Sequence, residues 1–126
     1  MINQNIIEMA SDTKNYGIKN KSKNIATCKN SLCGDKITVE LIFLREKVSK
    51  MYYETESCIF CQASASLLSK SIQNLKIKDF SNNLNDIISN KKLKSFKKLL
   101  NDKYQNRIEC IKLPFKAAMK VIERYR

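Results

Sequence analysis

The sequence predicts an α+β fold, in which helices pack on one face of a small antiparallel sheet of about three strands. Between residues 24 and 56, apolar and polar residues alternate with the period of half-buried strands. From residue 57 onward, apolar residues recur every three or four positions, the period of amphipathic helices. We expect a single domain over residues 1–126, comprising an N-terminal helix and loop (1–23), the sheet (24–56) and a helical part (57–126).

The first part of the chain predicts a short amphipathic helix followed by a loop. Ile2, Ile6 and Met9 are spaced by four and then three residues, so they share one helical face. Residues 11–22 are polar and are expected to form the loop. Residues 24–30 carry a faint strand pattern and are predicted to form an edge strand.

The next two segments predict a β-hairpin. Residues 36–44 alternate, and their apolar set is Ile37, Val39, Leu41 and Phe43. Arg45-Glu46-Lys47 is expected to turn the chain, and a second strand follows to about Glu56. One face of that strand is predicted to carry Met51, Tyr53 and Thr55. Val48 is out of phase with this face, which predicts a β-bulge.

Two helices are predicted directly after the hairpin. The first has an apolar stripe made of Cys61, Ala65, Leu68, Ile72 and Leu75. Asp79 is expected to cap the second helix. The apolar residues of this second helix are Phe80, Leu84, Ile87 and Ile88.

Two more helices are predicted toward the end of the chain. A short one is expected among the lysines at residues 93–100. The last one has a stripe made of Ile111, Phe115, Ala118, Ile122 and Tyr125. Pro114 is expected in its first turn, where a missing N–H costs nothing.

The charge of the chain suggests nucleic acid, but the residue types do not. The chain carries 24 Lys and Arg against 12 Asp and Glu, a formal net charge of +12. The excess is nearly all Lys, spread from Lys14 to Lys120, with little Arg, no Trp and no aromatic stacking platform. We therefore expect no specific nucleic-acid binding.

The apolar content and the cysteines indicate a compartment. No stretch approaches the roughly 20 apolar residues that a membrane span needs, so we expect no membrane association and a cytoplasmic location. Thiols are kept reduced there, and the five cysteines are expected to be ligands or reactive groups rather than disulfides. Without any His, a metal site must be completed by Asp, Glu or water.

The cysteines define a candidate metal site. Cys33 and Asp35 flank Gly34, so a thiolate and a carboxylate stand on one bendable turn. With Cys58, two thiolates and one carboxylate still fall short of a closed four-ligand site. Cys110 is the natural third thiolate, because it stands just before the last helix. Such a site suits zinc, or iron bridged by sulfide.

Three motifs together carry a family resemblance. They are Cys33-Gly34-Asp35, the pattern Cys-x-x-x-x-Ala-Ser-Ala-Ser that starts at Cys58, and Cys110 before an Ala-rich terminal helix. This combination resembles the IscU/SufU/NifU N-terminal family of iron–sulfur cluster scaffolds. Lys14-Asn15-Tyr16-Gly17 is similar to the family's Arg-Asn-x-Gly segment, so the resemblance covers nearly the whole chain. It implies the same α+β fold.

The resemblance implies an assembly scaffold that is not itself an enzyme. Cys33, Asp35, Cys58 and Cys110 would hold a transient 2Fe–2S cluster, iron or zinc. The partners would be a cysteine desulfurase, which supplies sulfur, and apo iron–sulfur acceptor or carrier proteins. Residues 102–109 replace the Leu-Pro-Pro-Val-Lys segment and the His of IscU-type scaffolds, which favours the SUF-type branch.

Two of the five cysteines, Cys28 and Cys61, are additional to the three cysteines of the family motifs. Cys61 lies on an apolar stripe one turn beyond Cys58, so core packing is the favoured interpretation and a fourth ligand the alternative. Cys28 is expected to sit in the first strand.

The alternatives to a scaffold are a zinc-bound sulfur shuttle that activates a desulfurase, a basic zinc-stabilised nucleic-acid-binding module, and a metal-free structural domain. The Cys58-x-x-Cys61 pair has no second close pair, which disfavours the nucleic-acid module.

Overall fold

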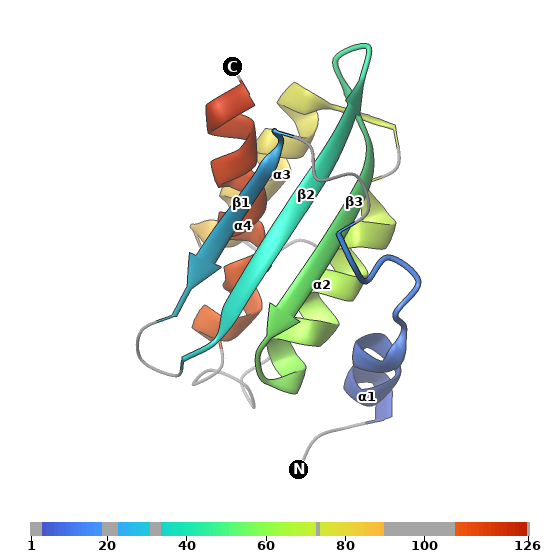
Figure 1. Cartoon of the computed structure of the whole chain (residues 1–126), viewed down its shortest axis with the longest axis vertical. Coiled ribbons are helices and arrows are strands. Elements are labelled where there is room, and N and C mark those ends of the chain that lie inside the picture. The colour runs from blue at the N-terminus through green and yellow to red at the C-terminus, as the bar shows by residue number, and fades with distance from the viewer. Residues whose placement is uncertain (1–3, 19–22, 31–33, 73, 90–107, 126) are drawn as a thin grey trace.

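The computed structural model of the chain describes residues 4–18, 23–30, 34–72, 74–89 and 108–125. Its elements, in chain order, are α1 (Gln4–Ser11), β1 (Ile25–Lys29), β2 (Lys36–Leu44), β3 (Lys47–Glu56), α2 (Ile59–Ser71), β4 (Leu75–Lys76), α3 (Ile77–Ile88) and α4 (Ile108–Tyr125). Figure 1 shows the sheet in front, with α2, α3 and α4 behind it and α1 at the lower right. The predicted α+β fold is confirmed. The short helix predicted at 93–100 lies outside the described residues.

The sheet is antiparallel, with the strand order β1-β2-β3-β4. β1 is the predicted edge strand, and β2 and β3 form the predicted hairpin. Arg45 and Glu46 turn the chain between them with positive φ angles of 52° and 64°. The predicted bulge is present, because the pairing register shifts between Ile42 and Phe43, opposite Val48. β4, which has only two residues, is a fourth strand in addition to the three that were predicted.

One face of the sheet packs against the helices and forms the core. Its fully or almost fully buried residues include Ile37, Val39, Leu41, Met51 and Tyr53. They alternate along β2 and β3, as half-buried strands require. On the helical side, α4 contacts β1, β2, α2 and α3, so α4 lies at the centre of the core. None of the described helices is long and apolar enough to span a membrane.

The prediction that Leu75 continues the first helix is wrong. α2 ends at Ser71, and Leu75 lies in β4, where it pairs with Val48. Asn74 adopts a positive φ of 60°, and its N–H donates to the carbonyl of Val48. This left-handed residue reverses the chain, so the helical spacing of Leu75 is coincidental.

Two predictions about helix starts are also wrong. The N-cap of α3 is Lys76, and Asp79 lies in the first turn, where a carboxylate still favours the helix dipole. Pro114 is the seventh residue of α4, because this helix begins at Ile108, before its apolar stripe. Pro114 therefore lacks the N–H that would bond to the carbonyl of Cys110, four residues earlier.

Candidate metal centre

Three segments far apart in the chain bring Asp35, Cys58 and Cys110 together. A carboxylate oxygen of Asp35 and the two sulfur atoms all lie within 4.8 Å of one another. Asp35 directly precedes β2, Cys58 is the N-cap residue of α2, and Cys110 is the third residue of α4. Three of the four predicted ligands therefore lie together. Figure 1 shows that β2, α2 and α4 all begin at the lower end of the sheet. The fourth, Cys33, lies outside the described residues.

The Asp35 carboxylate is buried and only half satisfied. Asp35 is 6% exposed, and its Oδ1 accepts a hydrogen bond of 3.2 Å from the main-chain N–H of Cys58. Its Oδ2 is buried and has no hydrogen-bond partner among the described residues. An unsatisfied buried polar atom costs about 1–3 kcal/mol, and more when it is charged. A cation bound between the carboxylate and the two sulfurs would offset that cost.

Backbone geometry at Gly34 aims Asp35 into the site. Gly34 has a φ of 75°, the left-handed region that favours glycine. The Gly34 N–H donates to the carbonyl of Asn30, and the Asn30 N–H donates to the carbonyl of Asp35, both at 2.8 Å. These two bonds join the end of β1 to the start of β2 on the Asp35 side of the glycine, whereas Cys33, on its other side, lies outside the described residues.

The Ala-Ser-Ala-Ser run holds α2 against its neighbours. Ala63 and Ala65 have no exposed surface, and small side chains allow close helix packing. The Ser64 hydroxyl donates to the carbonyl of Ile111 at 2.6 Å, next to Cys110. The Ser66 hydroxyl donates to the carbonyl of Asp12 at 3.2 Å. In the sequence, this run contributed only to the family resemblance. Serines inside an apolar helix are also a signal of side-chain hydrogen bonds, and that signal could have predicted these two contacts.

Cys61 and Cys28 lie outside the Asp35–Cys58–Cys110 group. Cys61 is fully buried in the core, and burial raises the pKa of its thiol to about 12. Its complete burial in the core and its place outside the group agree with the core-packing interpretation. Cys28 is half-buried in β1, as predicted, and burial raises the pKa of its thiol as well.

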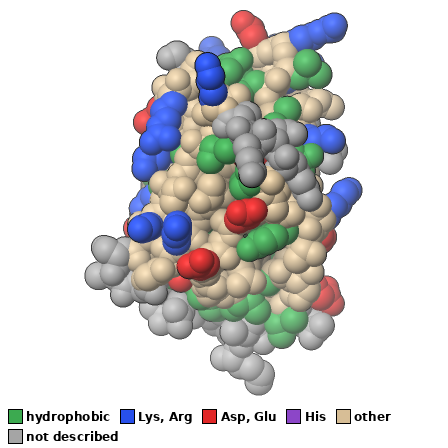
Figure 2. Space-filling view, viewed as in Figure 1, with side chains coloured by type: hydrophobic (Ala, Val, Ile, Leu, Met, Phe, Trp, Pro, Cys, Tyr) green, Lys and Arg blue, Asp and Glu red, His purple; other side chains and the backbone are tan. Residues whose placement is uncertain are grey.

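The surface charge is distributed rather than gathered on the sheet side. In Figure 2, the described Lys and Arg side chains lie mostly around the rim of this face, with carboxylates between them. Near the metal centre, Glu109 of α4 forms ion pairs with Lys116 at 3.2 Å and with Lys112 at 3.9 Å. The carboxylate beside Cys110 in the sequence is therefore neutralised within its own helix.

Comparison with known proteins gives a family and a fold. A model of the NifU-like N-terminal domain matches residues 1–126. One similar structure is a proposed iron–sulfur cluster assembly scaffold protein for the SUF system of the thermophile Fervidobacterium islandicum AW-1. It is 20% identical over 96% of each chain, with a TM-score of 0.80. Another is the N-terminal part of a nitrogen-fixing NifU-like protein from Brucella abortus. It is 21% identical, with 98% of this chain and 95% of that chain covered and a TM-score of 0.81. No curated protein matches the chain by sequence.

Proposed function

Because the chain belongs to the NifU-like N-terminal domain family, we propose that it is an assembly scaffold for iron–sulfur clusters. It accepts sulfur from a cysteine desulfurase, holds the nascent cluster or a metal ion on Cys33, Asp35, Cys58 and Cys110, and transfers it to acceptor proteins. The chain itself is not an enzyme in this proposal. The observation that carries it is the group of one carboxylate and two thiols within 4.8 Å, in which one buried oxygen of the carboxylate has no hydrogen-bond partner in the part of the chain that the structure describes.

The donor set fits a cargo that must later leave. Thiolates bind iron and zinc firmly, whereas a carboxylate oxygen is a harder and weaker partner for these metals. Asp35 is thus the ligand that can most readily yield to an acceptor or to solvent. Sulfur would arrive when a scaffold thiolate attacks the outer sulfur of a desulfurase persulfide and the desulfurase thiolate departs.

A zinc-bound sulfur shuttle is the second candidate, because the same donor set suits zinc. In that role the chain would raise the turnover of the desulfurase and would never build a cluster. The SUF-type assignment is compatible with both roles and does not separate them, because it depends only on residues 102–109, which replace the IscU-type segment.

Anaerobic purification followed by metal and acid-labile sulfide analysis separates the two roles. A scaffold reconstituted with a desulfurase, cysteine, ferrous iron and a thiol reductant, which supplies the electrons that convert persulfide sulfur to sulfide, should contain iron and sulfide in equal amounts and show a visible cluster absorption. The Cys58→Ser variant should lose both, whereas Cys28→Ser should retain them. Tightly bound zinc without any sulfide after reconstitution would instead identify the shuttle.

A further inference from the structure

The Thr55 hydroxyl links the two turns that carry Asp35 and Cys58. Thr55 lies near the end of β3, and its hydroxyl donates to the carbonyl of Lys36 at 2.7 Å. The same oxygen shares a hydrogen bond of 2.6 Å with the hydroxyl of Ser57. Lys36 directly follows Asp35, and Ser57 directly precedes Cys58. The Thr55 side chain therefore connects the neighbour of Asp35 to the neighbour of Cys58.

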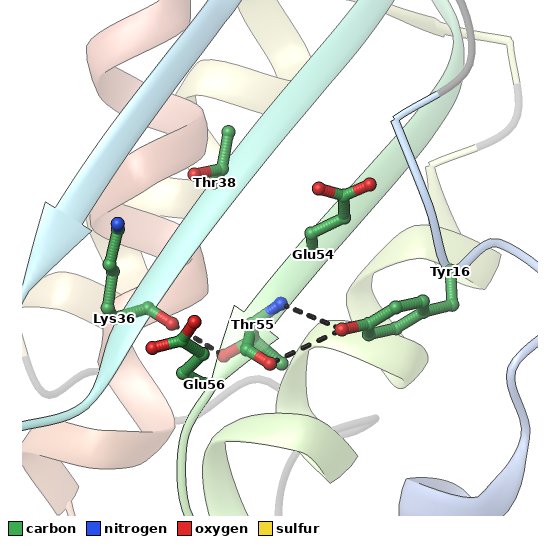
Figure 3. Close-up of a pocket in the computed structure, with 6 residues that line it drawn as sticks. All are labelled: Tyr16, Lys36, Thr38, Glu54, Thr55 and Glu56. Carbon is green, nitrogen blue, oxygen red and sulfur yellow. Dashed lines mark hydrogen bonds between the residues drawn. The ribbon is translucent and has the colours of Figure 1, made fainter.

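The backbone of Thr55 is held from the opposite side by Tyr16. The Tyr16 hydroxyl donates to the Thr55 carbonyl at 3.3 Å and accepts from the Thr55 N–H at 3.4 Å (Figure 3). The Tyr16 ring packs edge-to-face on Tyr53 at 5.4 Å, and the Gly17 N–H donates to the Tyr53 carbonyl at 2.7 Å. Tyr16 and Thr55 also line a cavity of about 190 Å³, together with Lys36, Thr38, Glu54 and Glu56 (Figure 3). The contacts of Tyr16 and Gly17 leave the Thr55 backbone little freedom to carry its hydroxyl away from the two turns.

The other bond between the two turns uses the candidate ligand itself. It runs from the Cys58 N–H to Oδ1 of Asp35 at 3.2 Å. A metal bound by the carboxylate would compete with the Cys58 N–H for the electron density and the orientation of this carboxylate. The Thr55 link uses the Lys36 carbonyl and the Ser57 hydroxyl instead, so it does not compete with a metal for the Asp35 carboxylate. The Gln62 side chain supports it, because its amide donates to the Ser57 carbonyl at 2.9 Å.

We propose that Thr55 is a positioning residue that sets the separation between the Asp35 carboxylate and the Cys58 sulfur. This inference rests on the proposed function of these residues as ligands. Among the described residues, the Thr55 hydroxyl bonds to Lys36 and Ser57 and contacts the core sulfur of Cys61 at 3.9 Å, so it acts on Asp35 and Cys58 through the main chain of Lys36 and through Ser57. Residues that orient metal ligands in this way typically change metal affinity 10–100-fold when they are mutated.

The test compares three variants by titration with Co²⁺ under anaerobic conditions. Thr55→Val keeps the β-branched shape and removes the hydroxyl, so it should raise the Kd for Co²⁺ about 10-fold and alter the ligand-field bands. Thr55→Ser keeps the hydroxyl and should restore the parental affinity. Thr38→Val is the matched control, because it removes a hydroxyl bonded at 2.8 Å to Thr27, between β1 and β2. It should leave the affinity for Co²⁺ unchanged.

A purely structural role predicts a different result. Thr55→Val and Thr38→Val would then both lower the melting temperature of the metal-free protein, and neither would change the affinity for Co²⁺ or the spectrum. That result would overturn the proposal. If Thr55→Val does not fold, Ser57→Ala takes its place in the Co²⁺ titration. It removes only one partner of the Thr55 hydroxyl, so it should weaken Co²⁺ binding, but by less than the 10-fold expected for Thr55→Val.

A second measurement separates this proposal from the function on which it rests. If the parent protein does not bind Co²⁺ at all, the proposed function fails. The rate at which iodoacetamide modifies Cys58 in the metal-free protein, followed by peptide mass mapping, still tests Thr55. We expect this rate to rise several-fold in Thr55→Val and to stay at the parental value in Thr38→Val. Equal rates in all three proteins would refute the positioning role of Thr55.

Discussion

The main-chain N–H of Cys58 donates a hydrogen bond of 3.2 Å to Oδ1 of Asp35, while Oδ2 of the same carboxylate is buried without a partner among the described residues. Oδ1 thus ties the residue before β2 to the start of α2, and the carboxylate as a whole lies within 4.8 Å of two cysteine sulfurs. The difference between the two oxygens separates a structural role of Asp35 from a ligand role, and the two can be tested independently.

The first prediction concerns the ligand set. Replacing Cys33, Cys58 or Cys110 with Ser should in each case abolish tight binding of iron or zinc, because a hydroxyl is a poor substitute for a thiolate. Cys28→Ser should bind as the parent does. Metal-to-protein ratios after gel filtration measure both effects. Loss of metal from Cys28→Ser as complete as that from Cys58→Ser would show that the assignment is wrong.

The second prediction separates the two oxygens of Asp35. Asp35→Asn keeps an oxygen that can accept from the Cys58 N–H but removes the negative charge, whereas Asp35→Ala removes both. We expect both variants to load a cluster and to transfer it to an apo-acceptor more slowly than the parent does, because both lose the negatively charged carboxylate that acts as the labile ligand. The measurement is the rate of transfer from equally loaded samples.

The control for Asp35 is the melting temperature of the metal-free proteins. A turn-only role predicts that Asp35→Ala melts lower and transfers its cluster at the parental rate. Parental transfer from a normally loaded Asp35→Ala sample would therefore exclude Asp35 as the labile ligand.

The third prediction concerns the pH dependence that arises from Cys61. Burial raises the pKa of this thiol from 9.0 to about 12, so the unfolded chain releases the proton at lower pH than the folded protein does. The contribution of the neutral thiol to stability is therefore complete below about pH 9 and is lost progressively as the pH rises toward 12. The parent should lose more stability between pH 8 and about pH 10.5 than Cys61→Ala does, as measured by guanidinium denaturation. An equal loss in both proteins would contradict this assignment.

The fourth prediction concerns Ser64. Ser64→Ala removes the 2.6 Å bond to the carbonyl of Ile111 and leaves that carbonyl buried, so it should cost about 1–2 kcal/mol of unfolding free energy. Ser71→Ala is the matched control, because its hydroxyl bonds only within α2, to the carbonyl of Leu68 at 3.0 Å. We expect the control to change stability by less than about 0.5 kcal/mol in urea denaturation. Equal losses in both variants would argue against a bridge between α2 and α4.

The fifth prediction concerns the net charge of +12. Lys-rich surfaces bind nucleic acid weakly through counterion release, so DNA should retain the protein at low salt without sequence preference. Binding should disappear near physiological ionic strength, as measured by fluorescence anisotropy with several DNA sequences. Sub-micromolar affinity for one sequence at that ionic strength would restore the nucleic-acid-binding alternative.

Much of the fold was predictable from sequence because secondary structure leaves a local periodic signal. The alternation in residues 36–44 predicted β2, and the phase error at Val48 predicted the bulge. The same reasoning failed at Leu75 and at the start of α4. A helical spacing can continue by chance past a left-handed residue such as Asn74, and a helix can begin before its apolar stripe does.

By itself, the sequence determined the α+β pattern, the family motifs and the residue types able to bind a metal. The motifs also proposed a ligand set and favoured core packing for Cys61, but only the tertiary structure decided the distances and the burial on which these assignments depend. Cys58 and Cys61 stand three positions apart, yet the first lies beside Asp35 and Cys110 and the second is sealed in the core with a pKa of about 12. The link through Thr55 and the bond from Ser64 to Ile111 are likewise invisible in the sequence. Periodicity and motifs are properties of neighbouring residues, whereas burial and contact between distant segments arise only when helices and sheet pack together.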